Sequence, residues 1–281
     1  MKKILFALLS IVSISLANKA FAQADTTTNK PKKHHTITIS NNGVFISGGD
    51  STSKAEKEIK KENKKFTMSY CLFDLGVNKI IDNTNYAAPS VKEFLNVPAN
   101  RQNKSLFDLV GPKAIDVNIY PWMIKFKALK THGQRIYISS GIGLQLYNFR
   151  YEDPITYTRN PTGIIIDTTK SYKKNKLALN YLNIPLMFTF KTRLGKDTWL
   201  VYGVGATAGV RLSSWTKQES SQFGKVKVYD QFGLNDYNTC LSAEIGLEGI
   251  FRLYATYQVT SLFQNGLDQH PICIGLRFGG I

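Results

Sequence analysis

The chain has 281 residues, of which 43% are hydrophobic, and its formal net charge is +16. This length allows one large or two modest domains, and the apolar content excludes a globally disordered chain. The excess of Lys and Arg favours anionic neighbours, although a soluble surface rich in lysine explains it equally well. Cys71, Cys240 and Cys273 form no close-spaced pair, so neither a disulfide framework nor a zinc site is indicated, and no metal is expected.

Residues 1–22 have the features of a secretory signal peptide. Two lysines precede the apolar stretch 4–16, and Ala20-Phe21-Ala22 is the small-x-small pattern that signal peptidase cleaves. We therefore expect an exported protein that begins near Gln23, with three lysines fewer and a net charge of 16 − 3 = +13. For such a protein the charge favours phosphorylated lipid head groups over nucleic acid. The apolar stretch is shorter than the roughly 20 residues of a membrane-spanning helix.

Residues 23–65 are expected to form a periplasmic hairpin and a basic linker. TITISNNGVFIS, 36–47, alternates on both sides of Asn41-Asn42-Gly43, which favours a tight turn because Asn and Gly accept positive φ. SKAEKEIKKENKK, 53–65, has only two apolar residues and therefore no face to bury. We interpret it as a solvated linker, and a helix that binds a membrane surface or a partner is the alternative.

From Phe66 onward the sequence consists of extended segments with a two-residue period. Short connections follow the second, fourth and sixth segments, and long ones follow the first, third and fifth, which places the long loops at one end of a sheet of antiparallel neighbours. Eight segments are predicted, at 66–78, 114–129, 134–150, 174–192, 197–213, 237–249, 250–261 and 270–279.

The two faces of these segments differ in an unusual way. In RIYISSGIGLQLYNFR, 135–150, one face carries Ile142, Leu144 and Leu146, and the other carries small residues such as Gly141 and Gly143. Small side chains fit inside a narrow closed barrel, and an aliphatic outer face requires lipid. A soluble barrel or sandwich, which would present Lys and Glu to water, is the alternative.

We therefore predict an all-β fold, an eight-stranded antiparallel up-and-down transmembrane β-barrel over residues 66–281 with a short N-terminal periplasmic extension. Lipid requires the ring to close, because an unpaired strand edge in hydrocarbon is costly. An even strand number leaves both termini in the periplasm. In the second segment the apolar phase flips near Pro121, which predicts a β-bulge there, and the facing of the first segment is ambiguous.

Several of these segments resemble a known family of membrane barrels. The residues that carry the resemblance are SGIGLQLYNFRYE (140–152), YLNIPLMFTFKT (181–192), VGATAGVRL (204–212) and LYATYQVTSLFQNG (253–266). They are similar to the small outer-membrane β-barrel domains of the PorT-like group of Gram-negative envelopes, over about residues 66–281. The resemblance implies an outer-membrane barrel with no catalytic residue set, in a family with one member associated with protein secretion. One departure is that Phe278 is followed by Gly279-Gly280-Ile281, whereas such barrels commonly end on an aromatic residue that the barrel-insertion machinery reads.

Five charged residues fall on the predicted interior face: Arg211, Glu244, Glu248, Arg252 and Arg277. Charges in a narrow lumen are costly unless paired, so we expect Glu244 and Glu248 to pair with these arginines and the lumen to be plugged. A small gated channel is the alternative. GVGATAG, 203–209, lacks the spacing and the following helix of a dinucleotide loop, so no cofactor is expected.

Recognition is expected in the long outer loops. The candidate residues are Tyr86, Tyr151, Tyr157, Trp215 and Tyr229, which stand among Lys and Arg in a mixture suited to glycan, lipopolysaccharide phosphate or protein. The alternative is that these rings pack the loops against one another. His270 lies near Asp268, but no motif fixes a serine nucleophile beside it, so we expect a protein that is not an enzyme.

The predicted function is that of an integral outer-membrane protein that acts as an envelope scaffold or binds a ligand or partner. The expected partners are outer-membrane lipid, lipopolysaccharide, the barrel-insertion machinery and a secretion or envelope protein, the last through residues 23–65. An accessory role in protein secretion is the alternative.

Overall fold

The computed structural model describes residues 35–40, 43–48, 65–169 and 171–279. The predicted signal peptide lies outside the described residues, as does nearly all of the predicted linker 53–65. β1 (His35–Ser40) and β2 (Gly43–Gly48) pair with each other in a two-stranded sheet, in the two arms of the predicted hairpin. Within the described ranges, no helix is both long and apolar enough to cross a membrane.

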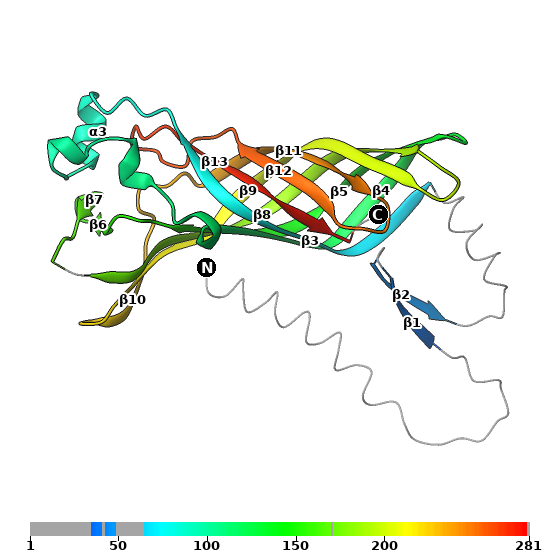
Figure 1. Ribbon diagram of the computed structural model, residues 1–281, viewed down its shortest axis with the longest axis horizontal. Helices are drawn as coiled ribbons and strands as arrows, with labels where there is room; N and C mark the ends of the chain where they lie inside the picture. The colour runs from blue at the N-terminus through cyan, green and yellow to red at the C-terminus, as the bar shows by residue number, and fades with distance from the viewer. Residues whose placement is uncertain (1–34, 41–42, 49–64, 170, 280–281) are drawn as a thin grey trace, which may run out of the picture. The chain divides into compact units, whose positions relative to one another are not determined.

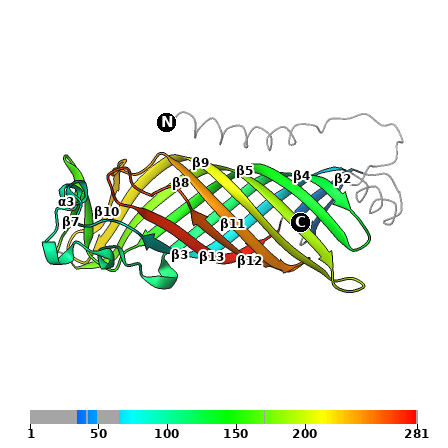
Figure 2. The same cartoon turned by 90° about the horizontal axis from the view of Figure 1, so that it is seen from above.

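Eight long strands form a closed antiparallel ring, in which each strand pairs with its neighbour in the chain (Figures 1 and 2). β8 and β9 pair along 21 registered positions, and β13 pairs with β3, so that the ring has no break between its first and last strands. The predicted all-β, eight-stranded up-and-down barrel is therefore confirmed. Its strands are β3 (Phe66–Asp82), β4 (Ile115–Lys130), β5 (Gln134–Arg150), β8 (Tyr172–Arg193), β9 (Trp199–Ser220), β11 (Tyr237–Leu247), β12 (Arg252–Gln258) and β13 (Gln269–Phe278).

The long connections contain further elements that the sequence did not predict. They gather at one end of the barrel, which we call the outer end, and the short turns lie at the other end (Figure 1). β10 extends the β-hairpin of β9 beyond the ring and pairs with β9 alone among the described strands. These elements are β6 (Ile155–Arg159), β7 (Thr162–Ile166), β10 (Gly224–Tyr229), α3 (Pro89–Phe94), and the 3₁₀ turns η1 (Ala99–Arg101), η2 (Lys104–Phe107) and η3 (Gly111–Lys113).

The apolar residues of the ring face outward. Along β8, Leu182, Ile184, Leu186 and Phe188 are exposed, with Ile184 at 59%, whereas the residues between them are buried. Because successive side chains of a strand point to opposite faces, the buried set lines the lumen. The sequence pattern, with apolar side chains on the outer face and small side chains on the inner face, is thus the pattern of the fold.

Two irregularities face each other on β3 and β4. The register of β4 against β5 shifts between Ile119 and Trp122, which places a bulge at Pro121 as the phase flip predicted. On β3, Cys71 has a φ of 58° and is left out of the pairing with β4. The outward phase of β3 changes at this residue, and this change explains why its facing could not be read from the sequence.

Candidate functional site

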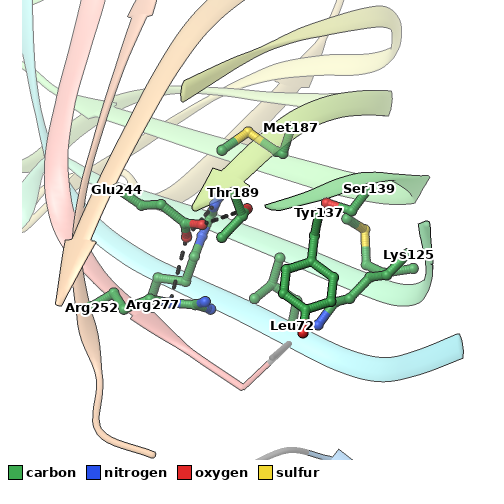
Figure 3. A pocket seen from close by; sticks show the side chains of 10 residues that line it. Leu72, Lys125, Tyr137, Ser139, Met187, Thr189, Glu244, Arg252 and Arg277 are labelled. Atoms are coloured by element: carbon green, nitrogen blue, oxygen red, sulfur yellow. Dashed lines mark hydrogen bonds and ion pairs between the residues drawn. The ribbon is translucent and has the colours of Figure 1, made fainter. Parts of the chain in front are cut away.

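A group of buried ion pairs lies in the lumen, and Figure 3 shows three of its members, Glu244, Arg252 and Arg277. Arg277 of β13 donates from Nε and Nη2 to the two carboxylate oxygens of Asp74 on β3, each at 2.7 Å, and Asp74 is fully buried. The Arg277 Nη1 donates to Glu244 of β11 at 3.1 Å, and Arg252 of β12 lies 3.5 Å from the same carboxylate. A bidentate guanidinium–carboxylate pair is the geometry that best offsets the desolvation of buried charges.

Glu248 and Arg211 form ion pairs with residues other than Arg252 and Arg277. Glu248 accepts a hydrogen bond from Lys191 of β8 at 2.5 Å. Arg211 lies nearer the outer end, where it pairs with Asp236 at 2.5 Å and donates to the carbonyl oxygens of Leu234 and Asn235. Our expectation that Arg211 supplies a counter-charge to Glu244 or Glu248 is therefore replaced by a role in holding the connection between β10 and β11 to the ring.

Asp74 and Lys191 were missed as lumen residues. Three carboxylates and three cations form a set that we call the lumen ion cluster. Its members are Asp74, Glu244, Glu248, Lys191, Arg252 and Arg277. Lys191 carried a sequence signal, because it has the parity opposite to the outward residues Phe188 and Phe190. Asp74 carried none, because the phase change at Cys71 hides its facing.

A small cavity of about 20 Å³ lies beside the lumen ion cluster. Lys125 and Tyr137 stand on one side of it and Glu244, Arg252 and Arg277 on the other (Figure 3). This volume holds about one water molecule. The cavity itself therefore holds little more than a water molecule.

The middle of the lumen is polar but close-packed. The amide oxygen of Gln145 accepts hydrogen bonds from Asn183 and Asn238 at 2.9 and 3.0 Å, across β5, β8 and β11. A Cβ atom at Gly209 would lie 1.8 Å from the Asn183 side-chain oxygen, so only glycine leaves room for this amide. The small residues of the interior face are thus the spaces into which larger side chains from neighbouring strands fit.

An apolar core closes the outer end of the barrel, and we call it the outer cap. All four connections at the outer end contribute to it, including the shorter one between β12 and β13, together with inward residues from the outer ends of β5 and β8. Its buried members include Val91, Phe94, Leu95, Leu106, Phe107, Tyr147, Phe149, Tyr151, Ile155, Tyr157, Ile164, Leu177, Leu179, Tyr181, Phe232, Leu234, Leu262, Phe263 and Leu267. The loops therefore fold over the mouth as a core of their own.

The candidate recognition rings divide between this core and the surface. Tyr151 and Tyr157 are buried in the outer cap with their hydroxyls 2.8 Å apart, and burial raises the pKa of both phenols. Tyr86 is half-buried, and burial, followed by its hydrogen bond to Asp82 at 2.6 Å, raises its pKa. For Tyr151 and Tyr157 the structure thus favours the alternative, packing of the loops.

Trp215 and Tyr229 remain at the surface. They pair across β9 and β10 with ring centroids 5.8 Å apart, and Tyr229 is 58% exposed. The ammonium group of Lys227 lies 4.4 Å from the Trp215 ring centroid and 4.5 Å from that of Tyr229. This is a cation–π arrangement on an accessible face.

A basic concavity of about 790 Å³ lies at the turn end of the barrel. The Arg193 Nη1 lies 3.2 Å from His132 Nε2, and the guanidinium of Arg135 stacks 4.4 Å from the Trp199 ring centroid. Its lining residues come from the β4–β5 and β8–β9 hairpins and from Glu248. These contacts tie the two turns together.

His270 is held by two acceptors. Its Nε2 lies 2.8 Å from Asp268 Oδ1 and its Nδ1 lies 3.0 Å from the Gln258 carbonyl oxygen. Among the described residues no serine hydroxyl is hydrogen-bonded to this ring, so a Ser–His–Asp relay is not assembled at His270. Over the same residues, no group of three or more His, Cys, Asp or Glu is placed to hold a metal ion.

The chain was compared with known proteins. No protein-family profile and no curated protein matches it. Among solved structures, it is similar to Ail, the attachment invasion locus protein of Yersinia pestis, with 7% identity, a TM-score of 0.26, and coverage of 75% of this chain and 97% of that chain. A second structure of Ail, in complex with the heparin analogue sucrose octasulfate, has 9% identity and a TM-score of 0.29 over the same coverage. The proposed function is therefore based on the residues of this chain alone.

Proposed function

We propose that the chain is an integral outer-membrane protein, a non-conducting barrel that anchors the outer cap at the cell surface and carries out no catalysis. The observation that supports this most strongly is the exposed apolar exterior of the ring. It recurs on strands far apart in the sequence, as at Leu75, Ile142, Ile184, Leu241 and Ile274. A soluble monomer rarely exposes a contiguous apolar patch larger than a few hundred Å².

The proposed orientation places the outer cap outside the cell and the short turns in the periplasm. Phe66 and Phe278, the first residue of β3 and the last of β13, belong to the turn end of the barrel, so one compartment receives both ends of the ring. Long loops outside and short turns inside are the rule for barrels of this kind. The proposed signal peptide supplies the route to the periplasm.

The filling of the lumen supports the proposed absence of conduction. The ion pairs around Arg277, the amides around Gln145 and the rings of Tyr147 and Tyr181 are stacked along it, and each is buried. Ions need a continuous polar path, and the apolar side chains of the outer cap interrupt it.

Two measurements test this proposal. Purified protein folded into lipid vesicles should migrate faster on a gel when unheated than after boiling, because a closed barrel resists detergent. Vesicle-inserted protein fused to planar bilayers should give no stable conductance steps. A protein that stays soluble without detergent would refute the membrane barrel, and reproducible nanosiemens steps would refute the closed lumen and favour the gated channel.

Membership of the PorT-like group and an accessory role in secretion are finer proposals, supported by the sequence resemblance alone. Cross-linking in intact envelopes tests the role in secretion. A partner of the secretion machinery whose capture requires residues 23–65 would support it. Capture that survives deletion of those residues would contradict the predicted role of the extension.

A further inference from the structure

Four cations stand in register across the outward face of the outer end. Arg150 on β5 pairs with Lys176 on β8, Lys176 pairs with Lys217 on β9, and Lys217 pairs with Lys227 on β10. Residues directly opposite one another on paired strands point to the same face of a sheet. The register therefore forms one row of four positive side chains, which we call the cation row.

The cation row faces away from the barrel axis. Its neighbours along β8, Asn175 and Leu177, are buried on the inward side, so Lys176 has the outward parity that Leu182 and Ile184 have farther along the same strand. On β5 the same outward face runs from Leu144 through Leu146 and Asn148 to Arg150.

On β5, the row has a defined height above the apolar exterior. Arg150 is four residues beyond Leu146, the last aliphatic outward residue of β5, which is about 13 Å along the strand at roughly 3.3 Å per residue. At a strand tilt of about 40° this is about 10 Å along the membrane normal. Lipid head groups occupy a layer roughly 5–8 Å thick beside the hydrocarbon. Long basic side chains that start at this height reach that layer.

An aromatic pair occupies the level between the apolar exterior and the cation row. Trp215 and Tyr229 lie two residues below Lys217 and Lys227 on the same face of β9 and β10. Aromatic residues of outer-membrane barrels gather at the boundary between hydrocarbon and head groups. The order aliphatic, aromatic, cationic therefore follows the order of a lipid monolayer from its tails to its head groups.

Among the described residues, no carboxylate forms an ion pair with any of the four cations of the row. The next row outward holds Lys174 and Lys225 on either side of Glu219, the only acidic residue among the outward positions of these two rows. The positive charges of Lys174, Lys217 and Lys227 act on Lys176. Like charges directly opposite one another destabilise a sheet, so a bound anion would relieve a repulsion that the fold otherwise retains.

We propose that the cation row, with Trp215 and Tyr229 beneath it, is a binding site for the phosphorylated head group of a lipid in the outer leaflet. Several lysine and arginine side chains converge on phosphate oxygens, and the two rings pack against the carbons nearest the head group. The occupant is a lipid because the site is continuous with the lipid-facing exterior. This inference rests on the proposed membrane insertion.

The test uses the full mature chain folded into vesicles of phosphatidylcholine that contain either lipid A or dephosphorylated lipid A. Lipid that remains with the barrel after detergent extraction is counted by native mass spectrometry. The test variant carries Lys176→Gln, Lys217→Gln and Lys227→Gln. The matched control carries Lys92→Gln, Lys104→Gln and Lys113→Gln, three exposed lysines of the β3–β4 connection, so that both variants lose the same charge at the same end.

The wild type and the control should retain lipid A and not its dephosphorylated form. The test variant should bind on the order of a hundredfold more weakly, because each lysine at an anionic membrane surface contributes about fivefold. Equal retention of the two lipids, an equal loss in the control, or displacement by millimolar inorganic phosphate would overturn the site. Heat-modifiable migration is measured on every sample. If it is lost in the wild type, membrane insertion itself fails, whereas unchanged migration with unchanged lipid binding refutes the cation row alone.

Discussion

Replacing Arg277 by methionine should destabilise the barrel more than any other single loss of an ion pair. Asp74 would keep neither of its two charged hydrogen bonds, which are both 2.7 Å long, and it would remain fully buried. Glu244 would still have Arg252 at 3.5 Å, so Asp74 is the carboxylate that would be left without a counter-charge. Removing one partner of a buried ion pair costs about 3–5 kcal/mol. We therefore expect the equilibrium constant for unfolding to rise by roughly two to three and a half powers of ten.

Urea titration of vesicle-inserted protein measures this loss, with the unheated gel mobility reporting the folded fraction. Arg159→Met is the matched control, because Arg159 pairs with Asp230 at 3.1 Å on the exposed surface. A surface pair contributes about 0–1 kcal/mol, so the control should unfold almost as the wild type does.

The double variant Asp74→Leu, Arg277→Met separates a stranded charge from lost packing. Because it removes both members of the pair, it should be more stable than Arg277→Met alone, with a coupling of about 2 kcal/mol or more. If Arg277→Met costs less than about 1 kcal/mol, or if the two single losses add in the double variant, the lumen ion cluster does not carry the energy assigned to it here.

Three further predictions address the other layers of the molecule. Leu186→Arg, on the apolar exterior, should lower the free energy of unfolding by roughly 2–4 kcal/mol if the proposed membrane position holds, whereas Asn180→Arg, nearer the outer end, should lower it by about 1 kcal/mol or less. Equal urea midpoints for the two variants would contradict the proposed membrane position. Tyr157→Ala should open the outer cap, so that proteinase K cleaves within 151–171 at least about tenfold faster while the gel shift is retained; unaltered cleavage would show that the ring is dispensable to the cap. Gly209→Ala should reduce the yield of folded barrel because its Cβ would lie 1.8 Å from the Asn183 side-chain oxygen, while Gly195→Ala in the β8–β9 turn, where the nearest atom is at 3.9 Å, should fold normally; similar yields for both would refute the close approach.

The ring itself was predictable because a strand repeats every two residues and each face meets one solvent. The outward residues Ile142 and Leu144 and the inward Gly141 and Gly143 indicated the barrel and its two faces before any long-range contact was known. Pro121 indicated the bulge in the sequence, because proline cannot donate to the strand pairing. No such residue type indicated the phase change at Cys71, and so Asp74 was not assigned to the lumen.

The outer end was less predictable, for a physical reason. Register places a residue on a ring strand, but the position of a residue in a long connection depends on packing between segments far apart in the chain. The ion pair between Arg211 and Asp236 is a contact of that kind, as are the ring contacts of Tyr157 with Phe232 and Phe263. The alternation of the segment around Lys217 and Lys227 did carry the signal for the extended hairpin, and a search for strand pairs inside the loops would have found it.

The single partner of β10 among the described strands has a consequence for contacts between copies of the chain. A strand with one free edge offers its backbone to any other strand that approaches, including the same strand of a neighbouring molecule. Lys225 and Lys227 alternate along this edge and are exposed. Two copies that met there would bring their lysines close together, so charge opposes self-association through the free edge of β10.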